Sequence, residues 1–234
     1  MKLLAFDTST EQMAIAVQHG NAVFDHVAVG GAAASATLIP AILALLQRAG
    51  LILQDLDAIC FGRGPGSFTG LRTACSVAQG LAFGAHVPVL PIDTLLALAQ
   101  TARMQQRDAA HPHICAALDA RMGQVYYSYY DFSSYPRIID KGLSLVYPQN
   151  MHVFDDFEHL VLAGNVRPVY DALLPCALRS AAYVHCLPDA RAMLQLAPAL
   201  LAAGQAVAAQ DAQPVYVRDK VAQTTQEREA LAPL

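Results

Sequence analysis

The sequence predicts an α/β fold of two similar units, each with the element order β-β-β-α-β-α-β-α. Short apolar runs typical of buried strands alternate with segments of helical periodicity along the chain. Each half opens with a strand, an aspartate, a turn and a second strand, at Asp7 and at Asp119. A polar stretch at 107–112 that ends in proline separates the halves. The order of elements therefore indicates an internal repeat.

The first unit, assigned to residues 1–108, is expected to hold the first five strands and three helices. Gly20-Asn21 marks a tight hairpin turn between the second and third strands. Apolar residues recur at helical spacing from 38 to 46, and Gly50 ends that helix. A glycine-rich loop then precedes a helix that ends near Gly84. The strands are predicted at 2–6, 13–17, 22–29, 58–61 and 87–92, and the third helix at 94–107.

The second unit, assigned to residues 109–213, repeats this order more weakly. Its strands are predicted at 113–118, 124–130, 138–146, 160–163 and 182–185, and its helices at 151–157, 166–174 and 189–203. The helix at 189–203 is expected to pack back on the first unit. Residues 214–234 are expected to form an extended Pro-Val-Tyr-Val segment followed by a polar, mobile tail.

The composition excludes several classes of protein. Of the 234 residues, 55% are hydrophobic, which excludes a disordered chain. Only 15% are charged, a low share that favours a surface partly covered by a partner. The net charge of −4 argues against a protein that binds nucleic acid alone, because that affinity comes mainly from neutralised phosphates.

The location is predicted from apolar runs and cysteines. The longest apolar run, 36–46, is about half of a membrane span, so no membrane association is expected. The 5 cysteines are odd in number and show no C-x-x-C spacing, which indicates a reducing, cytoplasmic setting without structural zinc. The histidines lack metal-ligand spacing, and no Ser/His/Asp set or acid–base carboxylate pair stands out. We therefore predict neither catalytic residues nor a metal site.

The turn Asp7-Thr8-Ser9-Thr10 is a first candidate for ligand binding. Its backbone N–H groups and hydroxyls suit a phosphate, and Asp7 could hold a magnesium ion through water. Alternatively, the turn is an ordinary hairpin in which Asp7 caps its own backbone. Residue types and spacing leave both readings open.

A glycine-rich loop between a strand and a helix is the second candidate, because helix N-termini favour anions. It is neither a Walker A loop nor a dinucleotide fingerprint, since Gly-Lys-Ser/Thr is missing and Ser67 stands where glycine is needed. Ser67 also lacks the frame of a nucleophile elbow. A ligand loop and an interface loop remain alternatives. The candidate residues are Gly64, Pro65, Gly66, Ser67, Phe68, Thr69 and Gly70.

Two further features allow alternative readings. In the turn from Asp119 to Gly123, Arg121 could bind a phosphate or carboxylate, or could pair with Asp119. The small residues Ala74 and Ala78 would let another helix approach closely, either inside the same unit or from a partner.

Four segments in the same order resemble the TsaB family, also called YeaZ: Asp7 to Thr10, Gly62 to Arg72, Leu118 to Gly123 with its tyrosine-rich strand, and Pro214 to Arg218. The resemblance runs nearly end to end. It implies an actin-like, Hsp70-like, sugar-kinase-like (ASKHA) fold of two lobes. It also implies a role in making N6-threonylcarbamoyladenosine at position 37 of tRNAs that read codons beginning with A.

The resemblance further implies a non-catalytic subunit that pairs with and activates TsaD, together with the ATPase TsaE. The catalytic paralogue TsaD carries metal-binding histidines on its first helix, where this chain reads Ala34 to Pro40 without histidine. RNA would be met only through the complex, and the chain alone could form a homodimer. No cofactor is expected to bind firmly, although weak ATP or ADP binding at Asp7 stays open.

The resemblance places the partner interface on the first lobe, through helices at about 36–49 and 70–84. The expected contact residues are Leu38, Ile42, Leu45, Leu46, Arg72, Ala74, Ala78 and Leu81. An ASKHA-fold ATPase or kinase with weak magnesium–nucleotide binding at the Asp7 turn is the alternative function.

Overall fold

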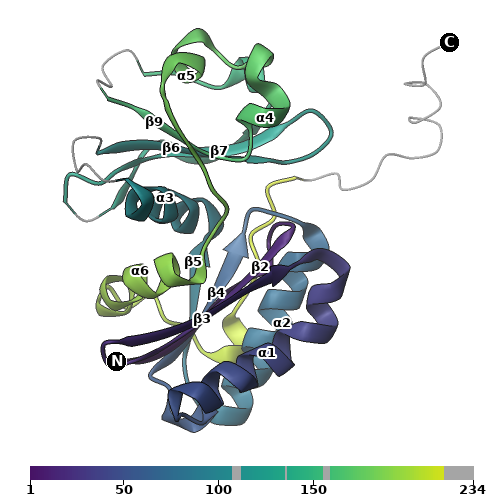
Figure 1. The fold of residues 1–234 in the computed structure, drawn as a ribbon, viewed down its shortest axis with the longest axis vertical. Coiled ribbons are helices and arrows are strands. Elements are labelled where there is room, and N and C mark those ends of the chain that lie inside the picture. Colours follow the sequence, from purple (N-terminus) through teal and green to yellow (C-terminus); the bar gives the residue numbers. More distant parts are fainter. Residues whose placement is uncertain (107–111, 135, 155–158, 219–234) are drawn as a thin grey trace, which may run out of the picture.

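The computed structural model describes residues 1–106, 112–134, 136–154 and 159–218. These residues form two α/β lobes stacked along the long axis of the molecule (Figure 1). The first lobe comprises residues 1–106 and a late helix, α6 (Ala190–Ala202); the second lobe comprises the described residues from 112 to 185. Each lobe is built on one five-stranded sheet.

The first sheet has the strand order β3-β2-β1-β4-β5. Strands β1, β2 and β3 form an antiparallel meander, whereas β4 and β5 join it in parallel. Alternation along β1 sends Leu4 and Phe6 to one face and Leu3 and Ala5 to the other, so both faces are buried. The strands are β1 (Lys2–Asp7), β2 (Gln12–His19), β3 (Ala22–Val29), β4 (Ala58–Gly64) and β5 (Val89–Asp93).

Helices cover both faces of this sheet. Helices α1 (Ala34–Ala49) and α2 (Phe68–Ala85) pack on one face, and α3 (Thr94–Gln105) and α6 pack on the other (Figure 1). The left-handed conformation of Gly50, with φ of 66°, ends α1 as glycine after a helix commonly does. Ser67 caps the N-terminus of α2. The helix α6 thus lies within the residues assigned to the second unit but packs on the first lobe, as expected for the helix at 189–203.

The second sheet repeats the topology with the order β8-β7-β6-β9-β10. Its strands are β6 (His113–Asp119), β7 (Val125–Asp131), β8 (Arg137–Val146), β9 (Val161–Gly164) and β10 (Ala182–His185). The helix α3 covers one face of this sheet and so joins the lobes, while the short helices α4 (Arg167–Tyr170) and α5 (Cys176–Ser180) cover the other. The predicted α/β fold of two similar units is therefore confirmed, although the described residues show no α-helix between β8 and β9.

The second lobe departs from the prediction in its connections. No helix forms at 151–154, and the rest of the predicted helix at 151–157 lies outside the described residues. The predicted helix at 166–174 is interrupted: α4 ends at Tyr170, and a turn of 3₁₀-helix (Asp171–Leu173) and then α5 follow. Pro175 explains why the helical stretch ends before Leu174, which is extended, because proline disfavours helical conformation in the preceding residue.

The chain's last described segment, 212–218, is extended and runs from the first lobe to the second (Figure 1). The predicted tail lies beyond the described residues. Within the described ranges, no helix is long and apolar enough to cross a membrane.

Candidate functional site

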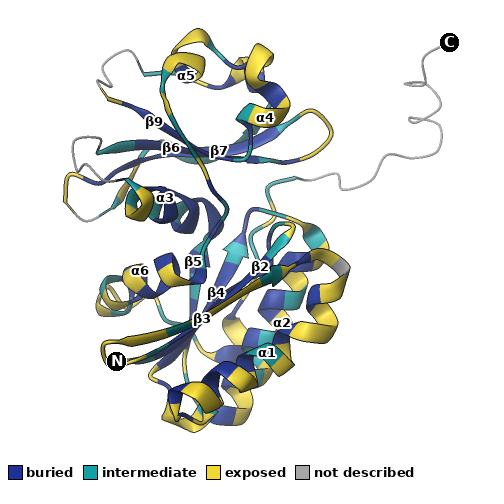
Figure 2. Ribbon diagram, viewed as in Figure 1, coloured by how far each residue is buried: buried dark blue, intermediate teal, exposed yellow. Residues whose placement is uncertain are grey.

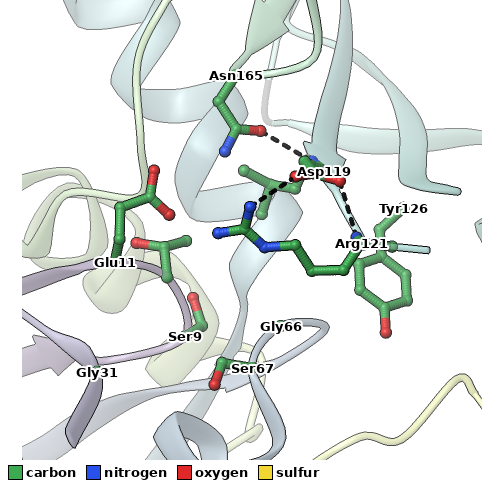
Figure 3. Close-up of a pocket in the computed structure, with 12 residues that line it drawn as sticks. Ser9, Glu11, Gly31, Gly66, Ser67, Asp119, Arg121, Tyr126 and Asn165 are labelled. Carbon is green, nitrogen blue, oxygen red and sulfur yellow. Dashed lines mark hydrogen bonds and ion pairs between the residues drawn. The ribbon is translucent and has the colours of Figure 1, made fainter. Parts of the chain in front are cut away.

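A cleft of about 310 Å³ lies between the two lobes (Figure 3). The turn after β1 and the loop before α2 form its first-lobe wall, and the turn after β6 forms its second-lobe wall. It is lined by Ser9, Thr10, Glu11, Gly31, Gly66, Ser67, Leu118, Asp119, Ala120, Arg121, Tyr126 and Asn165. The two aspartate turns that open the sequence repeats therefore meet at one site.

In the first turn, the Asp7 carboxylate is committed to its own backbone. Its Oδ1 accepts hydrogen bonds from the backbone N–H and the hydroxyl of Ser9, at 2.8 and 2.6 Å. The Thr8 hydroxyl donates to the Gly70 carbonyl at 2.7 Å. The bonds of Asp7 are those expected of a hairpin turn in which the aspartate caps its own backbone. Asp7 and Thr8 do not line the cleft, and of these three residues only Ser9 does.

The glycine-rich loop packs directly on this turn and leaves no room for side chains. A Cβ atom at Gly62 would lie 1.7 Å from the Asp7 Oδ2 atom, and one at Gly70 would lie 1.9 Å from the Thr8 carbonyl oxygen. Gly66 approaches the Ser9 carbonyl in the same way, and the Ser67 N–H donates to that carbonyl at 2.7 Å. The loop's glycines are explained by this close approach of two backbones.

Burial raises the pKa of Asp7 above its ordinary value, although hydrogen bonds from Ser9 and Thr94 oppose the shift. Asp7 is only 1% exposed. The Asp7 carboxylate is therefore covered by protein atoms and does not line the cleft. The loop residues Gly64, Pro65, Thr69 and Gly70 likewise do not line the cleft, whereas Gly66 and Ser67 do, with Phe68 in its neighbouring part.

In the second turn, Asp119 is the centre of a hydrogen-bond network that sequence reasoning missed in part. Its Oδ1 accepts from the Tyr170 hydroxyl and the Arg121 N–H, each at 2.8 Å, and its backbone N–H donates to Asn165. Burial, followed by the bond to Asp119, raises the pKa of Tyr170 to about 12. Asn165 and Tyr170 follow β9, so only the strand order places them beside Asp119.

Of the two roles considered for Arg121, the structure shows the pairing with Asp119, and binding of a phosphate or carboxylate stays a prediction. Its guanidinium forms an ion pair with Asp119 at 3.2 Å. The side chain is 76% exposed and points across the cleft toward Ser9 and Glu11 (Figure 3). Among the described residues, no group of three His, Cys, Asp or Glu side chains could hold a metal ion.

Comparisons with known proteins decide the family. A protein-family model described as "TsaD: tRNA N6-adenosine threonylcarbamoyltransferase" matches residues 28–150. The "tRNA threonylcarbamoyladenosine biosynthesis protein TsaB" of Escherichia coli is 32% identical, over 95% of this chain and 96% of that protein. The protein of that name in Haemophilus influenzae is 32% identical over 94% of this chain and 95% of its own. The chain belongs to the TsaB family.

A solved structure supports both the TsaB family and the fold. YeaZ from Pseudomonas aeruginosa is 37% identical, covers 92% of this chain and 99% of its own, and superposes with a TM-score of 0.85. Together with the topology repeated in both lobes, this similarity confirms the expected ASKHA fold. The match to the TsaD family model, 28–150, includes α1, α2 and the turn at Asp119.

The side chains expected to contact a partner are mostly buried in this chain's own core, which corrects that prediction. Six of them are at most 2% exposed and pack with the first sheet: Leu38, Ile42, Leu45, Leu46, Ala74 and Ala78. They cannot reach a partner of the folded chain. Leu81 is half-buried, and Arg72 is exposed but lies over the Phe68 ring with 3.8 Å between the guanidinium carbon and the ring centroid.

The same two helices expose other residues toward solvent. Figure 2 shows exposed positions along both α1 and α2. On α1, Ile39 and Leu43 are 41% and 49% exposed, and on α2 Phe83 is 72% exposed. Gly80 and Gly84 are also exposed on α2, and a Cβ atom at either would meet no atom within 4 Å. We call these five residues the outer helical face. The helical period that buries one side of α1 and α2 leaves this face apolar and uncovered.

Proposed function

We propose that this chain is a non-catalytic subunit of threonylcarbamoyladenosine biosynthesis. It pairs with TsaD and activates it for N6-threonylcarbamoylation of adenosine 37 in tRNAs that read codons beginning with A. Membership of the TsaB family supports the pathway, because its curated relatives carry that name. The observation that carries the pairing is the outer helical face, where Ile39, Leu43 and Phe83 stay exposed on a chain with few charges.

The same proposal includes the further partners. TsaE, the ATPase of the pathway, binds the TsaD pair, and tRNA is met through the assembled complex. Without TsaD, two copies of this chain pair through the same outer helical face, since an apolar surface gains most when it is covered. The network at Asp7 supports a structural role for that turn, because its carboxylate and the Ser9 hydroxyl bond to each other.

The variant Gly80→Glu tests the pairing without disturbing the fold. A side chain at Gly80 enters open space, and glutamate is a better helix former than glycine by about 0.5 kcal/mol. Burying its charge at an interface should weaken binding to TsaD by about 100-fold. The matched control is Ala202→Glu, which adds the same charge at an exposed position on α6. Titration calorimetry with TsaD from the same organism measures both variants.

Reconstituted tRNA modification tests the role as a subunit. With unmodified tRNA as the acceptor, TsaD, TsaE and TsaC, which makes the threonylcarbamoyl-adenylate from ATP, threonine and bicarbonate, should form the modified nucleoside only when this chain is present. Gly80→Glu should lower the yield in line with its lost binding. If the reaction proceeds equally without the chain, the activating role is wrong. If Gly80→Glu binds TsaD normally, the outer helical face is not the interface.

Weak nucleotide binding is the second candidate, supported by the cleft that meets both aspartate turns. In this reading the Ser67 end of α2 and Arg121 face the phosphates of ATP or ADP, as helix N-termini and guanidinium groups favour anions. Calorimetry with magnesium–ATP tests it. Micromolar affinity in the isolated chain would favour an ATPase, and no heat at millimolar nucleotide would remove this candidate.

A further inference from the structure

The extended segment 212–218, here called the strap, contacts both lobes within seven residues. Its first half lies on the first lobe: the Ala212 carbonyl accepts from the Gln79 side chain at 2.8 Å, and the Val215 N–H donates to the Arg63 carbonyl at 2.7 Å. Gly64 lets the strap approach this closely, because a Cβ there would lie 2.7 Å from the Val215 carbonyl oxygen.

The middle of the strap adds a side-chain anchor. The Tyr216 ring lies 5.3 Å from that of Phe68, centroid to centroid, and the Arg72 Nε donates to the Tyr216 hydroxyl at 3.1 Å. Arg72 also stacks on Phe68, so the three side chains form one layered cluster at the start of α2. The strap is therefore fixed to the first lobe up to Tyr216.

The last two described residues of the strap belong to the second lobe. Val217 packs against that lobe's core cluster, which includes Tyr126 and Leu118. The Arg218 guanidinium donates to the Ala120 carbonyl at 3.1 Å, to the Arg121 carbonyl at 3.3 Å and to the Gln124 side chain at 2.9 Å. The Nη2 atom makes all three of these contacts, while the Nη1 atom donates to the Met122 Sδ atom at 3.1 Å, so Arg218 contacts four residues of one turn.

The gripped turn has an unusual backbone. Arg121, Met122 and Gly123 have φ angles of 61°, 55° and 72°, so three consecutive residues lie in the left-handed region. Side chains with a Cβ rarely adopt this conformation, and such residues persist only where the surroundings hold them. The two backbone carbonyls to which Arg218 donates lie at the start of this turn, and Arg121 lines the cleft.

We propose that the strap is a clamp between the lobes and that Arg218 is a positioning residue for the turn that carries Arg121. The helix α3 joins the lobes by packing on both sheets. The chain also crosses between the lobes from β10 to α6. The strap adds a connection at a separate place, lining the part of the cleft that holds Phe68 and Tyr126, and so further restricts rotation of one lobe against the other.

Hydrogen exchange on the full chain tests the positioning role. The amides of Ala120, Arg121 and Gln124 are all hydrogen-bonded within the turn, so their exchange reports its opening. In Arg218→Ala we expect these amides to exchange about tenfold faster while the amides of β1 and β2 keep their rates. Arg179→Ala is the control, since it removes an exposed arginine from α5 of the second lobe.

The outcomes separate a positioning role from general stability. Unchanged exchange in the turn of Arg218→Ala would overturn the proposal. An equal increase in both lobes would also overturn it, because Arg218 would then only stabilise the whole fold. Arg218→Lys keeps the charge but lacks the planar fork, so it should restore little of the protection. Full protection of the turn's amides in that variant would show that a positive charge is enough to hold the turn. This would contradict a role for the hydrogen bonds of the guanidinium group.

Spin labels test the clamp itself. Cys176 is exposed on the second lobe while the other 4 cysteines are buried, and Asn21 is exposed in the turn between β2 and β3. In the variant Asn21→Cys, one spin label is attached to the new thiol at position 21 and another to Cys176. Pulsed electron paramagnetic resonance then measures the distance between the two labels, one on each lobe. Arg218→Ala should broaden that distance distribution and Arg179→Ala should not. An identical distribution in both variants would overturn the clamp, and neither result depends on how the chain pairs with TsaD.

Discussion

The two lobes share one strand order but treat equivalent turns in opposite ways. In the first lobe, Asp7 is 1% exposed and sealed under the glycine-rich loop. In the second lobe, Asp119 lies at the cleft and bonds to Tyr170, Asn165 and Arg121. The repeated fold therefore fixes where each aspartate lies, while the connections after the parallel strands decide what each can contact.

The comparison shows that a shared topology does not give two equal sites. The first turn is closed by the glycine-rich loop, where a Cβ at Gly62 would overlap the Asp7 carboxylate and one at Gly70 the Thr8 carbonyl. The second turn is held by side chains and by Arg218 from the strap. Of the two aspartates, only Asp119 therefore lines the cleft, although Ser9, Glu11 and Ser67 line it from the first lobe.

The largest expected effect on the closed first turn comes from Gly62→Ala. Its Cβ would overlap the Asp7 Oδ2 atom at 1.7 Å, so the turn or the strand β4 must shift. We expect a loss of about 4 kcal/mol in the free energy of unfolding, measured by urea denaturation. Gly80→Ala is the matched control, because its Cβ meets open space and should add up to about 1 kcal/mol.

A double-mutant cycle sharpens the first prediction. Asp7→Ala removes the clashing carboxylate, so Gly62→Ala should cost less in that background than alone. Purely additive losses would show that the clash with Asp7 is not the cause. Asp7→Ala should also leave pairing with TsaD intact, because Asp7 is buried beneath the cleft and far from solvent.

Acid unfolding distinguishes two buried carboxylates. Bonds from Ser133, and then Arg137, lower the pKa of Asp131 in the second lobe to about 2 from 3.8. This group therefore adds stability above pH 4, and that stability is lost as the pH falls through 4 toward 2. Asp131→Asn should reduce the stability at neutral pH by up to about 2 kcal/mol and flatten the acid limb. An unchanged acid limb would contradict this assignment.

The contribution of Asp7 to stability should change with pH in the opposite direction to that of Asp131. Its pKa is raised by burial, so the folded state holds the proton more tightly than the unfolded state does. The wild-type chain should lose stability from this group as the pH rises above 3.8. Asp7→Asn should abolish that part of the pH dependence, measured as urea midpoints between pH 3 and pH 7. A steeper pH dependence in Asp7→Asn would contradict the raised pKa.

The smallest expected effect concerns the second turn. Tyr170→Phe removes the hydroxyl that donates to Asp119 at 2.8 Å, and it should cost about 1.5 kcal/mol. Tyr147→Phe, at a tyrosine that is 51% exposed, is the control and should change little. Equal effects would show that the Asp119 network adds nothing beyond packing.

Much of the fold could be predicted because apolar periodicity is local information. The strand at 22–29 coincides with β3, and Gly50 ends α1 as its position indicates. The helix predicted at 166–174 is divided after Tyr170 into α4 and a 3₁₀ turn, and Pro175 accounts only for its end at Leu174. The aspartate turns were found from the repeat, whereas Asn165 and Tyr170 needed the strand order.

The interface residues show a further limit of sequence reasoning. The period of α1 marks Leu38 and Ile42 as one face, but it does not say whether a sheet or a partner covers that face. The structure buries them on the first sheet and leaves Ile39 and Leu43 outside. On α2, the small residues Ala74 and Ala78 were predicted to meet a partner, but the large exposed side chain is Phe83.

The most direct test of pairing is the mass of the chain mixed with TsaD from the same organism. Light scattering after gel filtration at micromolar concentration should give one peak with the mass of a one-to-one complex. Gly80→Glu should leave two separate peaks, while Ala202→Glu should behave as the wild-type chain. Two separate peaks from the wild-type mixture, or an intact complex with Gly80→Glu, would contradict pairing through the outer helical face.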